Sequence, residues 1–173
     1  MFSVRISELY GWAAHLPYPD RVRELHDMRI AAKRLRYLFE FFTPCFGEEL
    51  AGLLKRFKQL QDYLGEIHDC DVWVDYLRAQ LREAYHELDA ARRGLSSFVG
   101  ADPDLRTGAQ SLREQLARGP AQGLLMMLVD VVERRSRLYG ELLGFWAQLE
   151  ADDFHGQLIR LVAAAARLEK LEA

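Results

Sequence analysis

Apolar side chains recur at intervals of three and four residues along almost the whole chain. This spacing gathers them on one face of an α-helix, whereas a half-buried strand would alternate apolar and polar residues. Alternating runs are absent, and so are the Asn-Gly and Asp-Gly pairs that mark tight hairpins. The sequence therefore predicts an all-α protein.

Helix-breaking and helix-capping residues divide this pattern. Two prolines in Leu-Pro-Tyr-Pro end the first helix, and Asp20 is suited to cap the second. Gly65 marks the expected end of the third, and Pro120 suits the first position of a long later helix. The predicted helices cover about 2–14, 21–42 and 48–65, then a fourth that begins at Asp69 or Asp71 and runs to about 93, and last 120–150 and 154–173. A loop over 94–119 contains a possible short helix at 107–117.

Short turns between long amphipathic helices favour neighbours that pack antiparallel. A chain of 173 residues with 50% hydrophobic content can bury one core. We therefore expect a single domain over residues 1–173, an antiparallel bundle of long helices, with Trp73, Tyr76 and Trp146 among its core aromatics.

Basic residues are concentrated in one segment. The net charge of the chain is −3, yet Arg21–Arg36 contains six Lys or Arg and only two acids. On a helical wheel of the second helix, His26, Arg29, Lys33 and Arg36 fall within an arc of about 80°. A core stripe lies beside this row, and it comprises Met28, Ala32, Leu35, Leu38, Phe39 and Phe42.

Four basic groups this close repel one another, so the row needs a counter-charge. Acids of the same chain could supply it, which would make the row an ordinary charged face. A ligand with several phosphates could also supply it, because Arg binds phosphate oxygens in pairs and Lys offers a movable charge. The row predicts a basic groove that spans roughly 10 Å from Arg29 to Arg36.

Further cations lie on other predicted helices. Lys55 and Lys58 lie on the third helix, on the flank next to its core face. Arg135 occupies a position that periodicity assigns to the core of the long helix, and Arg134 is its neighbour. An unpaired Arg in a core is costly, so we expect Arg135 to pair with an acid or to reach the same anion site.

Two stretches carry a resemblance to a known family. "LHDMRIAAKRLRYLFEFF", with its H-x-x-R-x-x-x-K-R-L-R-Y pattern, is followed by "LLKRFKQLQDYLGEIHDCDVWVDYL". Together they resemble the CHAD domain over residues 25–77. The resemblance implies a helical bundle that binds inorganic polyphosphate through basic residues and without catalysis.

Position by position, His26, Arg29, Lys33 and Arg36 match the family's basic row, and Lys58 matches the basic position of its next helix. The family typically holds two copies of such a unit, whereas this chain shows one. The resemblance therefore implies that the chain forms a homodimer or is part of a longer architecture.

Other chemistry has little support in the sequence. His68–Asp71 (HDCD) offers metal-binding residue types, but adjacent residues cannot all converge on one ion, so we expect no metal. We expect no enzyme activity and no cofactor, because Gly-rich phosphate loops, nucleophile motifs and clustered carboxylates are absent.

Two cysteines and no apolar run of about 20 residues favour a cytoplasmic protein without a membrane segment, bound to polyphosphate granules if the resemblance holds. The alternative function is a structural or interaction bundle whose row docks an acidic protein or RNA; nucleic acid ranks below polyphosphate.

Overall fold

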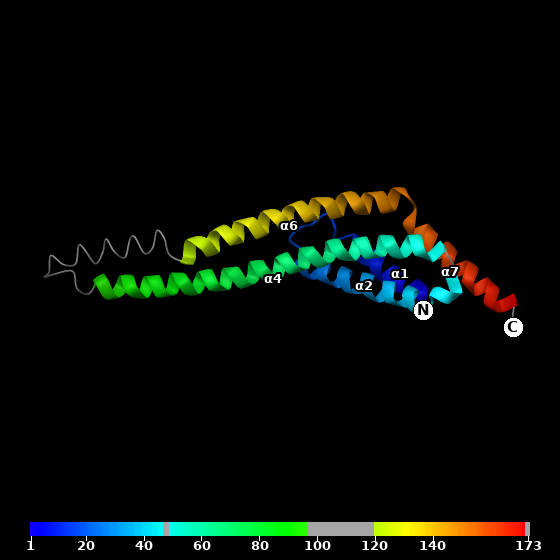
Figure 1. Cartoon of the computed structure of the whole chain (residues 1–173), viewed down its shortest axis with the longest axis horizontal. Helices are drawn as coiled ribbons and strands as arrows, with labels where there is room; N and C mark the ends of the chain where they lie inside the picture. The colour runs from blue at the N-terminus through cyan, green and yellow to red at the C-terminus, as the bar shows by residue number, and fades with distance from the viewer. Residues whose placement is uncertain (47–48, 97–119, 172–173) are drawn as a thin grey trace. The chain divides into compact units, whose positions relative to one another are not determined.

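The computed structural model describes residues 1–46, 49–96 and 120–171, and all its regular structure in these ranges is helical. The prediction of an all-α fold is confirmed. The helices, shown in Figure 1, are α1 (Phe2–Ala13), α2 (Val22–Phe41), α3 (Thr43–Phe46), α4 (Glu49–Ser96), α6 (Pro120–Ala151) and α7 (Phe154–Leu171). The loop predicted from Gly94 is wrong at its start, because residues 94–96 belong to α4. The rest of the predicted loop and the short helix predicted at 107–117 lie outside the described residues.

Helix α4 corrects the prediction of two helices with a break after Gly65. It is one helix of 48 residues. A single interior glycine costs only about 1 kcal/mol relative to alanine, and the segment holds no proline. Buried residues instead continue every seven positions through the expected break, at Leu53, Leu60, Ile67, Val74 and Leu81. Packing along this repeat outweighs the local cost of Gly65.

The helix starts agree only partly with the predicted caps. The N-cap of α2 is Arg21 and makes no side-chain cap, so the predicted cap at Asp20 is wrong. A turn that joins the Arg21 N–H to the Tyr18 carbonyl at 3.2 Å shifts the helix start by one residue. At α7 the Asp153 carboxylate accepts a hydrogen bond from the Gly156 N–H at 3.2 Å, and its ion pair with Arg160 lowers the pKa of Asp153.

The helices form two compact units. The first unit comprises Met1–Asp69 and Arg135–Ala173, and the second comprises Cys70–Arg134. Both α4 and α6 contribute to each unit, so the boundary falls inside helices rather than in a loop. A single domain over residues 1–173 stays a prediction.

In the first unit, α1 and α2 run antiparallel. Phe2, at the start of α1, contacts Phe39 near the end of α2, with 4.9 Å between ring centroids. Glu8, later in α1, pairs with Arg34, which comes before Phe39 in α2. Figure 1 shows these helices beside the first half of α4. The antiparallel arrangement brings sequence-distant apolar faces together in one core.

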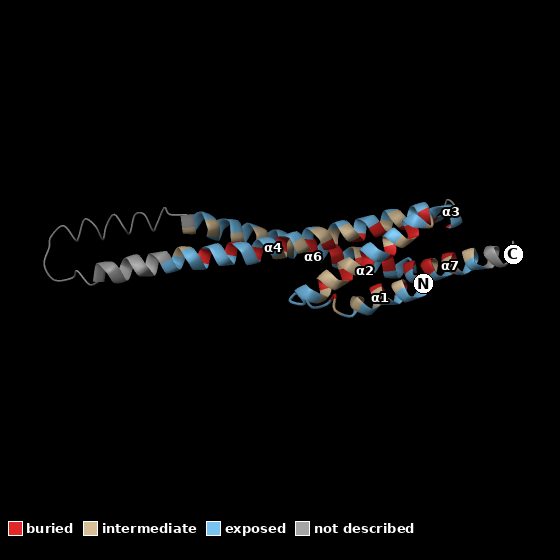
Figure 2. Ribbon diagram, turned by 90° about the horizontal axis from the view of Figure 1, so that it is seen from below, coloured by how far each residue is buried: buried red, intermediate tan, exposed pale blue. Residues whose placement is uncertain are grey.

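A chain of aromatic contacts fills one end of this core. Phe39 of α2 lies 5.5 Å from Phe46 of α3 and 5.9 Å from Phe57 of α4, measured between ring centroids. Phe57 in turn lies 5.2 Å from Phe154 of α7. Figure 2 shows buried residues along the facing sides of these helices. With Phe2 of α1, which contacts both Phe39 and Phe46, five helices contribute rings to this cluster.

In the second unit the buried side of α4 consists of Cys70, Val74, Leu77 and Leu81. Trp73 and Tyr76 are about half exposed, at 50% and 53%, so their predicted core position is wrong. At about 100° per residue, Trp73 lies about 70° and Tyr76 about 130° from the centre of this buried side, so Trp73 is on its flank and Tyr76 faces largely away from it. Trp146 is buried, as expected.

Phe57→Ala should lower the free energy of unfolding by about 3–5 kcal/mol, because the side chain is fully buried and its removal leaves a cavity. Phe41→Ala is the matched control, since Phe41 is 79% exposed, and should change it by at most about 0.5 kcal/mol. Urea unfolding followed by circular dichroism measures both. Equal losses in the two variants would contradict the described core.

Candidate anion-binding site

The site is built on the antiparallel pair of α2 and α4. His26 lies beside His68, with 4.6 Å between ring centroids, and Phe39 lies beside Phe57. Between these contacts, Arg29 lies over Gly65, because a Cβ placed on Gly65 would be 4.0 Å from Arg29 Nε. As the residue numbers of α2 increase, those of its neighbours on α4 decrease, so the two helices run antiparallel. This register determines which cations of the two helices are neighbours.

The register places Lys58 at the same level as Arg36. Arg29 and Arg36 are seven residues apart, as are Gly65 and Lys58, so each pair occupies one face of its helix two turns apart. Because Gly65 faces Arg29, Lys58 lies on the flank of α4 that faces α2. We call His26, Arg29, Lys33, Arg36 and Lys58 the basic strip.

Most cations of the basic strip have no acidic partner. Within the described residues, no ion pair is formed by Arg29, Lys33 or Lys58. Lys33 and Lys58 are exposed, and Arg29 is partly exposed. Asp62 is at about the level of Lys33 in the register, yet the two side chains form no ion pair. The intramolecular pairing that an ordinary charged face would show is therefore largely missing.

Arg36 is the member of the strip that has a counter-ion. Its guanidinium donates to Glu40 at 2.8 Å, four residues along the same helix, and lies over the Tyr37 ring at 4.8 Å. Its Nε is buried and has no hydrogen-bond partner. Exposed pairs at this spacing contribute only about 0.3–0.5 kcal/mol. A stronger anion can therefore displace Glu40 at small cost.

The histidine at the end of the strip has a partner that the sequence-based prediction missed. The Nδ1 atoms of His26 and His68 are 3.3 Å apart, so one imidazole donates and the other accepts. His68 belongs to the L-G-x-x-H-D pattern, which is the signal that could have identified it.

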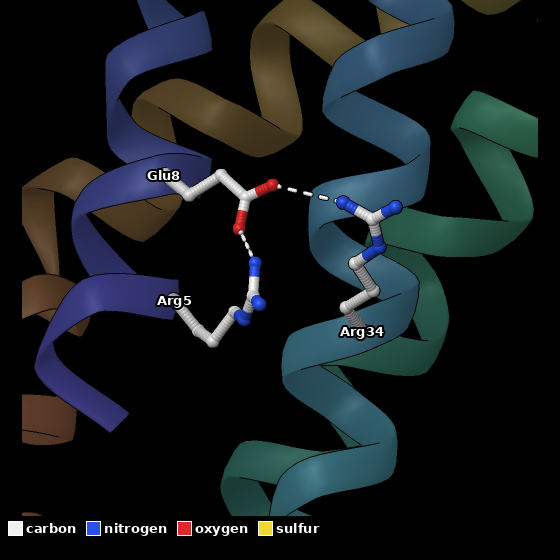
Figure 3. Close-up of polar contacts among 3 residues, drawn as sticks. All are labelled: Arg5, Glu8 and Arg34. Atoms are coloured by element: carbon white, nitrogen blue, oxygen red, sulfur yellow. Dashed lines mark hydrogen bonds and ion pairs between the residues drawn. The ribbon is translucent and has the colours of Figure 1, made fainter. Parts of the chain in front are cut away.

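Arg34 lies off the strip, as its place on the wheel predicts. It donates to Glu8 of α1 at 3.2 Å, and the same carboxylate also accepts from Arg5 (Figure 3). The Glu8 carboxylate therefore joins α1 to the side of α2 that lies away from the strip. Arg34 belongs to the packing of α1 and provides a control for the strip.

The other predicted site residues lie at different places. Lys55 is exposed and three residues before Lys58, about 60° farther round α4 toward solvent. Arg135 is partly exposed and donates to the Pro19 carbonyl at 2.9 Å, at the turn before α2. Arg134 is exposed and belongs to the second unit. The roles of these three residues in anion binding stay predictions.

Apart from the strip, the described residues contain a pocket but no cluster of metal-binding side chains. No group of three or more His, Cys, Asp or Glu in the described ranges could hold a metal ion. A pocket of about 530 Å³ lies between the start of α4 and α7, and it contains Arg56 and Arg160. Both arginines already have acidic partners, Asp152 at 3.2 Å and Asp153 at 2.9 Å. In this pocket both cations are neutralised, whereas in the strip only Arg36 has an acidic partner among the described residues.

The described helices include no segment that is both long and apolar enough to cross a membrane.

In comparisons with known proteins, the family model of the CHAD domain matches residues 5–78. No curated protein and no solved structure matches the chain. The matched segment is less than half of the chain and contains every residue of the basic strip. CHAD domains are generally binding domains that are associated with polyphosphate and not known to be catalytic. Residues 5–78 are therefore a partial match to the CHAD domain, as the resemblance predicts.

Proposed function

We propose that this protein binds inorganic polyphosphate, without catalysis, along the basic strip of α2 and α4. The observation that carries the proposal is that Arg29, Lys33 and Lys58 have no acidic partner among the described residues. Clustered like charges at a protein surface are stabilised by a bound polyanion. The match to the CHAD domain supports phosphate as the anion.

The geometry suits a chain of phosphates better than a single carboxylate. Arg29 and Arg36 lie two helical turns apart, roughly 10 Å along the axis, so one small anion cannot contact both. Lys33 lies between them, and Lys58 of α4 flanks the row on the side of Arg36. Successive phosphates of one polyanion would therefore meet cations from two helices, and its binding would release counterions.

Arg29→Ala/Lys33→Ala/Arg36→Ala should raise the Kd for long-chain polyphosphate at least about tenfold at low salt, because three phosphate contacts are lost. Isothermal titration calorimetry measures this effect. Arg5→Ala/Arg23→Ala/Arg34→Ala is the matched control, since it removes the same charge from α1 and the far side of α2. Its Kd should stay within about twofold of wild type, apart from long-range electrostatics.

Two results would reject the proposal: equal weakening by the two triple variants, or no binding of polyphosphate by the wild-type chain at low salt. Circular dichroism of each variant separates loss of the site from loss of the fold.

Glu40→Gln should strengthen polyphosphate binding by about twofold, because the ligand would no longer compete with Glu40 for Arg36. The measurement is the same titration, performed at fixed ionic strength. Glu8→Gln changes the net charge equally but removes a carboxylate that pairs with Arg5 and Arg34. If Glu8→Gln strengthens binding as much as Glu40→Gln does, the effect is one of net charge, and the role assigned to Glu40 is wrong.

Polyphosphate and RNA share phosphate chemistry, so a competition experiment decides between them. We expect polyphosphate to displace a fluorescent single-stranded RNA at lower phosphate concentration than RNA displaces polyphosphate. The exposed ring that contacts the strip in the described residues is Tyr37, which lies under Lys33 and Arg36, whereas RNA-binding surfaces use several exposed aromatics for base stacking. Recruitment to polyphosphate granules in the cytoplasm follows if the proposed affinity holds in cells. An acidic protein surface remains the alternative ligand of the same strip.

A further inference from the structure

Tyr37 is the last residue of the H-x-x-R-x-x-x-K-R-L-R-Y pattern, and the proposed function assigns it no role. Its ring contacts two cations of the basic strip. Lys33 Nζ lies over the ring at 5.7 Å from the centroid, and the central guanidinium carbon of Arg36 lies over it at 4.8 Å. A cation within about 6 Å of a ring centroid is attracted by the negative face of the ring. One side chain therefore holds two cations of the strip.

The places of these residues on α2 explain why one ring serves two cations. Lys33 precedes Tyr37 by four residues, so the two side chains lie on the same side of the helix, one turn apart. Arg36 directly precedes Tyr37 and is rotated about 100° from it, so its long side chain bends along the helix surface to reach the ring. The conformations of both basic side chains are therefore restricted before any ligand binds.

We infer that Tyr37 positions Lys33 and Arg36 for the polyanion, an inference that rests on the proposed function of the basic strip. Long Lys and Arg side chains lose conformational entropy when a ligand fixes them, and a ring that already restricts them removes part of this cost. The ring contacts the face of the guanidinium, whereas the N–H donors lie in its plane and can reach Glu40 or a phosphate.

A ring suits this task better than an acid would. Its negative face offsets part of the repulsion between Lys33 and Arg36 while no ligand is bound. Unlike a carboxylate, it carries no net charge, so the strip keeps its full attraction for a polyanion. Tyr37 thus stabilises two neighbouring cations without neutralising them.

Phe41 is the matched control, one turn farther along α2. Its exposed ring contacts Phe42, with 5.0 Å between centroids, and within the described residues no cation lies over it. Phe41→Leu therefore removes an exposed ring from the same helix without affecting a cation. Tyr37 is also exposed, so helix content should stay unchanged in variants at either position.

NMR of the full chain tests the positioning without a ligand. We expect the methylene protons next to the Lys33 and Arg36 charges to resonate upfield of their ordinary positions, because the ring shields protons that lie over its face. Tyr37→Leu should abolish this upfield shift, whereas Tyr37→Phe and Phe41→Leu should retain it. Equal shifts in the wild type and in Tyr37→Leu would overturn the inference.

Calorimetric titration with long-chain polyphosphate tests the consequence for binding. Tyr37→Leu should raise the Kd about threefold, since an exposed cation–ring contact corresponds to about two- to fivefold in Kd. Tyr37→Phe should keep the wild-type Kd. In the Lys33→Ala/Arg36→Ala background, Tyr37→Leu should have no further effect, because no cation remains over the ring. An equal effect of Tyr37→Leu in both backgrounds would contradict the inference.

The two measurements separate this inference from the proposed function. Upfield shifts in a wild-type chain that binds no polyphosphate would reject the proposed function and leave the positioning of the two cations by Tyr37 in place. Normal binding with ordinary shifts would reject the positioning and leave the proposed function in place.

Discussion

The contact between α2 and α4 is the interaction on which the proposed function depends. One side of α2 packs Met28, Leu35 and Phe39 into the core of the first unit. The flank next to it holds Arg29 and Arg36, which lie against α4 at the levels of Gly65 and Lys58. Because the core side is fixed by burial, the rotation and register of α2 are fixed too. The cations are thus positioned by apolar packing rather than by acidic partners.

This arrangement explains how a protein with a net charge of −3 can present a cationic surface. Several acids of the first unit pair with cations away from the strip. Glu8 pairs with Arg5 and Arg34, and Asp152 and Asp153 pair with Arg56 and Arg160. Glu40 alone among the described acids pairs with a strip residue. In the proposed function, local pairing rather than net charge therefore determines where a polyanion binds.

Much of this could be predicted from the sequence, because helical periodicity determines both the core stripe and the basic row of α2. The failures arose where tertiary packing outweighs local signals. Gly65 indicates a helix end, yet α4 continues past it because buried residues repeat every seven positions on both sides of this glycine. Trp73 and Tyr76 have helical spacing, but their exposure depends on which side of α4 the neighbours occupy. His68 was missed because its partner His26 is 42 residues away in sequence.

The central claim is that a polyphosphate chain lies along the basic strip. The most direct test is a crystal structure of the protein grown with a short polyphosphate at low ionic strength. We predict phosphate oxygens within hydrogen-bond distance of Arg29, Lys33 and Lys58, with Arg36 turned from Glu40 toward the ligand. A polyphosphate bound instead in the pocket of Arg56 and Arg160, with the strip free of ligand, would contradict the account.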